Sequence, residues 1–136
     1  EAATPRAQPV VESLGEIARR HKLTAEGLVA LVDARQEEID GPLDVVRAGH
    51  ALADLQLDVL AVGDPATRDA ARAVAAAWLM GEGPERGALL AEARARRHEV
   101  DLAALPILLP ALSLGGPTSP WRTPLAYWWA AKRGRY

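Results

Sequence analysis

The stretch from residue 64 to residue 80, DPATRDAARAVAAAWLM, decides the fold class. Asp64 is one of the residue types that cap helix N-termini, and Pro65 suits the first helical position because the N–H that it lacks would have no partner there. Small and apolar side chains then recur three and four residues apart, at Ala70, Ala73, Val74, Ala77 and Trp78. This spacing predicts a helix that ends near Met80 and buries this face. So many alanines indicate that a neighbouring helix approaches closely.

The composition of the whole chain has the same helical bias. Ala and Leu make up 47 of the 136 residues, Val, Ile and Thr only 18, and Phe is absent. Alanine and leucine favour helices, whereas β-branched and aromatic residues favour strands. A hydrophobic fraction of 49% with 25% charged residues is typical of a globular protein, and no apolar run approaches the roughly 20 residues that span a bilayer. We therefore predict an all-α, single-domain bundle of about six or seven helices.

Helix start and stop signals divide the rest of the chain. Thr24 and Asp101 are expected N-caps, and Gly63 is expected to close the helix before Asp64. The further predicted helices cover residues 9–22, 24–40, 43–61, 85–98, 102–114 and 124–133. The helix predicted over residues 102–114 is expected to be kinked or broken at the two prolines that it contains. The side chains expected to face inward are Val10, Val11, Leu14, Ile17 and Ala18 in the first helix, Leu28, Leu31, Val32, Arg35 and Ile39 in the second, and Val45, Leu52, Leu55 and Val59 in the third.

Charge is distributed unevenly along three segments. Residues 1–8 are a polar lead-in, residues 9–120 form the helical domain, and residues 121–136 carry a charge of +4 with no acid. The first 120 residues carry −6, so the whole chain has a net charge of −2, which argues against a nucleic-acid-binding protein. Because the chain has no Cys, disulfides, thiol catalysis and thiolate metal sites are excluded.

Two acidic clusters are the weak candidates for a metal site. Asp54 and Asp58 are four residues apart on a predicted helix, so that both carboxylates share a face, as Mg²⁺-diphosphate binding would require. A solvated surface pair is the interpretation that we favour for them. Asp33, Glu37 and Asp40 form a second acidic stripe, near which Arg35 is expected to snorkel or to pair with an acid on a neighbouring helix. Nothing else in the sequence has the spacing of a catalytic or cofactor motif, so we assign no catalytic, cofactor or metal residue.

The C-terminal segment combines aromatic and basic side chains. Trp and Tyr favour the headgroup level of membranes, and Trp, Tyr and Arg dominate binding hot spots. One interpretation of the segment is therefore a surface that binds a membrane or a partner protein. The other is a helix that packs on its own domain. Under the first, we expect Leu125 and Trp129 to point inward and Trp128 outward. The candidate docking residues are Trp121, Arg122, Tyr127, Trp128, Lys132, Arg133, Arg135 and Tyr136.

Several stretches resemble the squalene/phytoene synthase family, and in particular its bacterial non-carotenoid members that are related to a mitochondrial complex I assembly factor. The resemblance covers most of this chain but only about half of a family member, whose fold is the isoprenoid synthase fold. The segments that carry it are PVVESLGEIARRHKL at residues 9–23, LVDARQEEID at residues 31–40, residues 50–63 and 64–80, AALPILLPAL at residues 103–112, and WAAKRGRY at residues 129–136.

The resemblance implies a helical module without the family's chemistry. The synthases hold Mg²⁺ and prenyl diphosphates through two Asp-rich motifs; the first would precede Pro9, and Leu79–Gly87 stands where the second belongs. No catalytic residue carries over.

We expect a non-catalytic interaction or assembly module of a membrane-associated complex such as a respiratory one, without a cofactor. It would lie peripherally on the cytoplasmic side of a bacterial inner membrane, or on the matrix side in a mitochondrion. A protein complex is the expected partner, and an anionic lipid surface is a further candidate. The alternative is a fragment of a prenyl-diphosphate transferase whose Asp-rich motifs lie on a missing segment or partner chain.

Overall fold

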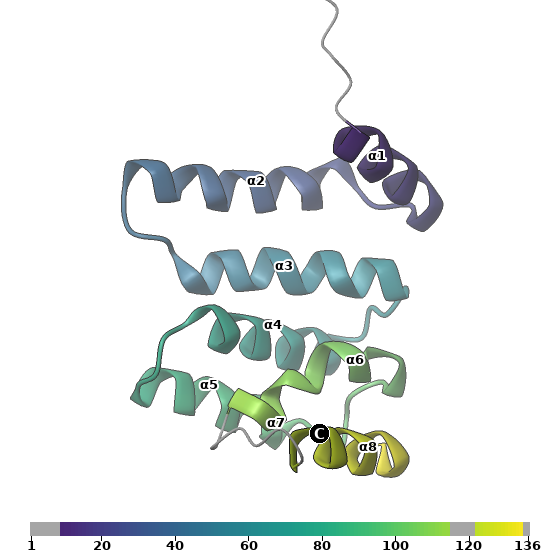
Figure 1. The fold of residues 1–136 in the computed structure, drawn as a ribbon, viewed down its shortest axis with the longest axis vertical. Helices are drawn as coiled ribbons and strands as arrows, with labels where there is room; N and C mark the ends of the chain where they lie inside the picture. The colour runs from purple at the N-terminus through teal and green to yellow at the C-terminus, as the bar shows by residue number, and fades with distance from the viewer. Residues whose placement is uncertain (1–8, 115–121, 135–136) are drawn as a thin grey trace, which may run out of the picture.

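The structure, a computed structural model, describes residues 9–114 and 122–134, and these residues form a single all-helical domain (Figure 1). No strand occurs in those two ranges, so the predicted fold class is confirmed. The elements are α1 (Pro9–His21), α2 (Ala25–Asp40), α3 (Val45–Leu60), α4 (Pro65–Leu79), α5 (Pro84–Ala95), the 3-10 helix η1 (Leu102–Ala104), α6 (Leu105–Leu108), α7 (Pro110–Leu114) and α8 (Arg122–Arg133).

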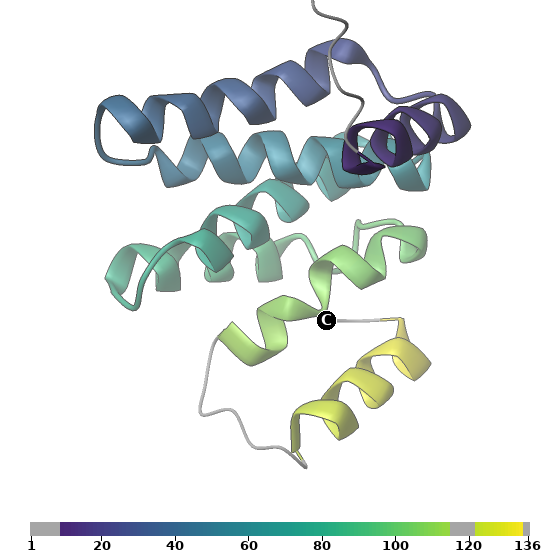
Figure 2. The same ribbon diagram turned by 45° about the horizontal axis from the view of Figure 1, so that its top comes forward.

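The helices are stacked in layers around α3 and α4. α3 packs between α2 and α4, and α4 packs in turn against α5, α6 and α7. α8 contacts α7 and lies at the opposite end of the molecule from α1 and α2, as Figure 2 shows. The core therefore sits around α4, and the first and last helices form the two ends of the stack.

The alanine-rich face of α4 does bring a neighbouring helix very close. Ala70, Ala73 and Ala77 are buried in the core, as predicted. At the crossing with α3, a Cβ atom added to Gly49 would lie 2.5 Å from both the Cα and the N of Ala76. Only a glycine leaves room for this approach, because real Cβ atoms do not come that near to backbone atoms.

Side-chain caps fix the helix starts where the sequence predicts them. Thr24 accepts a hydrogen bond from Gly27 N (3.2 Å), and Asp64 accepts one from Thr67 N (2.8 Å). These bonds satisfy N–H groups that have no partner inside the helix. The predicted role of Gly63 is wrong: α3 ends at Leu60, and Ala61 caps it in the left-handed conformation (φ 55°) with its N–H bonded to Asp58 O.

The expected inward faces of α1, α2, α3 and α4 need correction. The inward stripe predicted for α2 is wrong at Val32 and Ile39, which are 63% and 75% exposed, while Ala34 is buried instead. α2 packs mainly on α3, so only one narrow face of it is covered. Leu14 and Ile17 on α1, Val59 on α3 and Trp78 on α4 are also exposed rather than inward.

The prolines divide the segment that the sequence predicted as one kinked helix. Residues 102–114 form η1, α6 and α7, with Asp101 capping the first of them through Ala103 N (2.8 Å). α5 ends at Ala95, short of the predicted His98, and α8 begins at Arg122. Among the described helices, none has the length and hydropathy needed to cross a membrane.

Candidate functional site

α8 is held on the domain by its small and hydroxyl-bearing side chains. Tyr127 Oη donates to Ser113 Oγ on α7 (3.0 Å), which itself donates to Pro110 O (2.9 Å). Ala130 is buried, and Tyr127 is half-buried. Beyond the helix end, Gly134 (φ 61°) lies against the side chain of Leu102 in η1. The candidate docking residue Tyr127 is therefore on the packed side of α8.

The largest apolar side chains of α8 point away from the domain. Leu125, Trp128 and Trp129 are 56%, 55% and 44% exposed, and their spacing of three and four residues puts them on one face of the helix. The expectation that Leu125 and Trp129 point inward is wrong. The stripe of Tyr127 and Ala130 packs instead, because the tyrosine hydroxyl finds a partner on α7 and the alanine allows close approach.

Cationic side chains lie beside the exposed tryptophans. The Nζ of Lys132 is 5.1 Å from the ring centroid of Trp128, and the guanidinium carbon of Arg133 is 4.5 Å from that of Trp129. The two rings meet edge to face at 5.5 Å. Both cations are therefore within the range of cation–π attraction, which holds positive charge next to the apolar surface.

The α8 cations differ from most other arginines of the chain in their partners. Arg20, Arg35, Arg47, Arg68, Arg72 and Arg96 each form an ion pair with a carboxylate. Within residues 9–114 and 122–134, no carboxylate pairs with Arg122, Lys132 or Arg133. We call the face formed by Arg122, Leu125, Trp128, Trp129, Lys132 and Arg133 the α8 surface; its positive charge is not neutralised by the described part of the chain.

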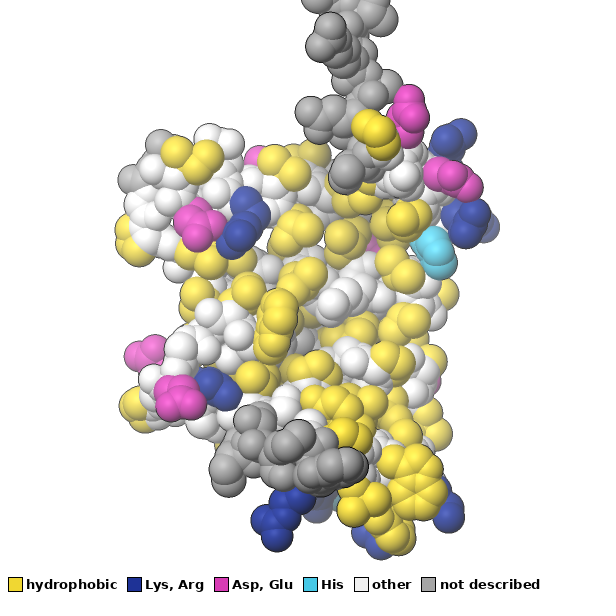
Figure 3. Space-filling model, in the orientation of Figure 1, with side chains coloured by type: hydrophobic (Ala, Val, Ile, Leu, Met, Phe, Trp, Pro, Cys, Tyr) yellow, Lys and Arg dark blue, Asp and Glu magenta, His cyan; other side chains and the backbone are white. Residues whose placement is uncertain are grey.

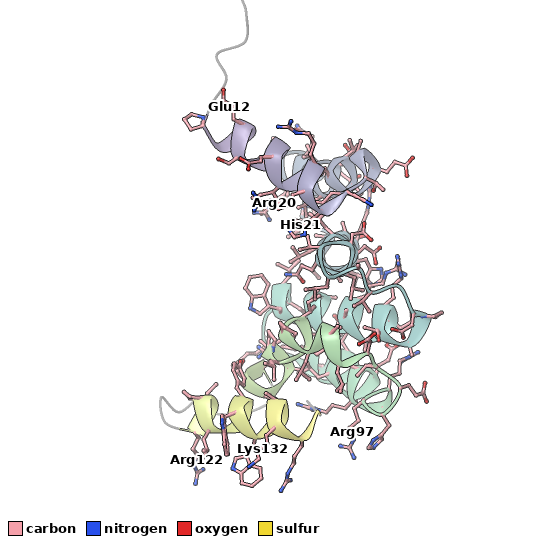
Figure 4. The ribbon with its side chains drawn as sticks, turned by 90° about the vertical axis from the view of Figure 1, so that its right-hand side faces the viewer. Glu12, Arg20, His21, Arg97, Arg122 and Lys132 are labelled. Carbon is pink, nitrogen blue, oxygen red and sulfur yellow. The ribbon has the colours of Figure 1, made fainter. Side chains whose placement is uncertain are left out.

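The α8 surface forms one end of the molecule. In Figure 3 the lower edge carries Lys and Arg side chains beside hydrophobic ones, and the visible Asp and Glu side chains lie higher or to the left. Figure 4 shows Arg122 and Lys132 directed away from the domain at this end, with Arg97 near it, whereas Glu12, Arg20 and His21 mark the opposite end. The remaining candidate docking residues, Trp121, Arg135 and Tyr136, lie outside the described residues.

Asp54, one of the two weak candidates for a metal ligand on α3, is engaged by arginine side chains. The carboxylate of Asp54 accepts hydrogen bonds from Arg72 Nε (3.0 Å) and from a second Arg72 guanidinium nitrogen (2.7 Å), and Arg68 lies 3.6 Å away. The hydrogen bonds to Asp54 also raise the pKa of Arg72. Two arginines thus hold Asp54 between α3 and α4, and this arrangement is a structural ion pair. Across the described residues, no three His, Asp or Glu side chains are grouped as metal ligands.

One member of the acidic stripe on α2, Glu37, is also engaged in an ion pair. Arg35 pairs with Glu38 (2.9 Å) on its own helix, so the expected pairing with an acid on a neighbouring helix is wrong. The contact between helices is made instead by Glu37, which pairs with Arg47 on α3. Spacing alone could not decide whether Arg35 pairs within its own helix or with a neighbouring one. A partner three residues away, such as Glu38, can be reached within one helix, but the pattern does not show which acids a neighbouring helix brings near.

A small apolar cavity lies between α3, α4 and the α6–α7 segment. Its volume is about 210 Å³, and its walls include Leu52 and Gln56 from α3, Val74 and Trp78 from α4, and Pro106 and Ile107 from α6. Apart from the apolar positions themselves, nothing in the sequence predicts this cavity, because the prolines that line it were expected only to interrupt a helix.

Comparisons with known proteins do not test the resemblance to the squalene/phytoene synthase family, which stays a prediction. No protein-family model matches this chain, and no curated protein or solved structure is significantly similar to it.

Proposed function

We propose that the chain is a non-catalytic interaction module that docks through the α8 surface on a membrane-associated assembly. The observation that carries the proposal is the presence, on one helix face, of three exposed large apolar side chains and of three cations that pair with no carboxylate among the described residues. Monomeric proteins rarely leave contiguous apolar patches in water, and such patches mark interaction sites. Trp and Arg are also the residue types that contribute most at binding hot spots.

The family resemblance supports the accessory part of this proposal. It implies an assembly or accessory module of a membrane complex, such as a respiratory one, on the cytoplasmic side of a bacterial inner membrane or the matrix side of a mitochondrial one. The alternative of a prenyl-diphosphate transferase fragment gains no support from Asp54, because Arg72 and Arg68 already occupy its carboxylate.

Fractionation of the cells in which the chain is native tests the proposal. The full chain is compared with the double variant Trp128→Ala/Trp129→Ala, and Trp78→Ala serves as the matched control because Trp78 is an equally exposed tryptophan on α4. We expect the wild-type chain and Trp78→Ala to be recovered with the membrane fraction, and the double variant to be recovered with the soluble fraction. Equal membrane recovery of all three, or recovery of none, would overturn the proposal.

A further inference from the structure

We propose that the α8 surface binds the phosphate headgroups of an anionic lipid bilayer directly, with Trp128 and Trp129 entering the headgroup layer. This inference rests on the proposed function and specifies the partner of the same surface. It follows from the shape of the surface, from the placement of its charges and from the charge of the remaining molecule.

The α8 surface is a ridge rather than a groove. α8 packs on α7 at one end of the stack, and Figures 1, 2 and 4 all show it at that end with no other helix of the described residues beyond it. A convex ridge can lie flat on a bilayer, whereas a protein partner would have to supply a groove that matches it. Of the described helices, α8 is therefore the one whose outward face a planar surface at this end would meet.

Charge and apolar area are arranged along the ridge as a bilayer surface requires. α8 has 12 residues and so a length of about 18 Å. Arg122 occupies its first position and Lys132 and Arg133 its last two, so cations flank the apolar side chains at both ends. Tryptophan favours the boundary between headgroups and acyl chains, and cations meet lipid phosphates at the same depth. The positions of Lys132 and Arg133 over the indole rings put both chemistries at one level.

The other exposed apolar stripe has the wrong charge for this partner. Val29, Val32 and Ile39 line the outer side of α2, but Glu26 and Asp33 lie among them as exposed acids. An anionic bilayer would repel that stripe. Since residues 1–120 carry −6 and residues 121–136 carry +4, the field of an anionic membrane turns the C-terminal end of the chain towards it.

Vesicle sedimentation with the full chain tests the inference. Vesicles of phosphatidylcholine alone are compared with vesicles that contain about 30% phosphatidylglycerol, because only the second kind has a negative surface potential. We expect the chain to sediment with the anionic vesicles and to remain in solution with the neutral ones. Binding should weaken when the salt concentration rises from about 0.1 M to about 0.5 M, because salt screens exposed charges.

Variants of the surface separate the contributions of charge and aromatic area. Replacing Arg122, Lys132 and Arg133 together by Gln should weaken partitioning by about a hundredfold, since each basic residue contributes about fivefold near an anionic surface. The control with the same change in charge replaces Arg19, Arg20 and Lys22 by Gln at the opposite end, and it should bind nearly as the wild type does. Trp128→Ala/Trp129→Ala should weaken binding by about tenfold or more, and Trp78→Ala should not.

Three results would overturn the lipid inference. The first is that the chain does not bind anionic vesicles although its circular dichroism spectrum shows that it is folded. The second is that it binds neutral vesicles as strongly as anionic ones. The third is that both triple variants lose the same amount of binding. The proposed function has its own readout in the cell fractionation. If the chain does not bind vesicles but Trp128→Ala/Trp129→Ala still abolishes its recovery with the membrane fraction, the partner is a protein. The lipid inference then fails and the proposed function stands. Failure in both experiments rejects both.

Discussion

Asp54 and Asp58 share one helix face, but of the two only Asp54 forms ion pairs within the described part of the chain, and substitution should reveal the difference. Asp54→Ala leaves the guanidinium of Arg72 without its two hydrogen bonds in a partly buried position, so we expect it to lower the free energy of unfolding by about 1–2 kcal/mol. Asp58→Ala is the matched control and should change stability by less than about 0.5 kcal/mol. Urea unfolding measures both. Equal effects, or a stabilisation by Mg²⁺ that both variants lose, would instead indicate a metal-binding pair.

Asp64 gives the helix cap a pH dependence. Hydrogen bonds from the hydroxyl and the backbone N–H of Thr67 lower the pKa of Asp64 below its ordinary value. A carboxyl whose pKa is lowered by folding stabilises the fold above its unfolded pKa, and this contribution is lost as the pH falls through the folded pKa. We therefore expect the wild type to lose part of its stability below about pH 4.

The variant Asp64→Asn isolates this contribution. Asparagine still caps the helix but does not titrate, so its free energy of unfolding should fall less steeply below about pH 4 than that of the wild type. Unfolding curves at a series of pH values make the comparison. Parallel pH profiles for the two proteins would show that the Asp64 carboxylate does not contribute in this way.

At the level of elements, the crossing of α3 and α4 depends on a single missing side chain. Gly49→Ala puts a methyl group where the backbone of Ala76 lies, so the two helices must separate, and we expect a loss of about 2–3 kcal/mol in the free energy of unfolding. Gly87→Ala on α5 is the control, because its Cβ would meet no atom within 4 Å. It should raise stability by about 0.5–1 kcal/mol through helix propensity. A loss of similar size in both variants would contradict the close crossing.

The starts of the helices could be predicted from the sequence, whereas the sides that they bury could not. Thr24, Asp64 and Asp101 act as caps through bonds to residues two or three positions away, so short-range pattern is sufficient. Burial depends on which neighbour covers a helix. Val32 and Ile39 have the spacing of a buried stripe, yet α3 covers the side of α2 that carries Ala34.

The candidate site shows the same limit at α8. The sequence identified the aromatic and basic segment, because its composition is distinct from that of the rest of the chain. It could not identify the packed side, because Leu125 with Trp129 and Tyr127 with Ala130 are both pairs at helical spacing. The hydrogen bond from Tyr127 to Ser113 decides between them, and it joins residues that are far apart in the pattern.

For the molecule as a whole, we predict binding without prenyl-transfer chemistry. The isolated chain should neither hydrolyse nor condense prenyl diphosphates in the presence of Mg²⁺, since residues 79–87 hold no Asp-rich motif where the resemblance to the synthases would put the second one, and Asp54 is occupied by Arg72. Product analysis with radiolabelled prenyl diphosphates checks this. Turnover that disappears in the variant Asp54→Ala/Asp58→Ala would contradict it and favour the transferase alternative.

The central claim is that the large apolar side chains of α8 lie outside the core and are available for docking. Urea unfolding of Trp128→Ala/Trp129→Ala tests it most directly, because it needs no knowledge of the partner. The account predicts a free energy of unfolding within about 0.5 kcal/mol of the wild type, as for substitutions at exposed positions. A loss of about 3–5 kcal/mol, which is the cost of removing a buried tryptophan, would show that these rings belong to the core and would contradict the claim.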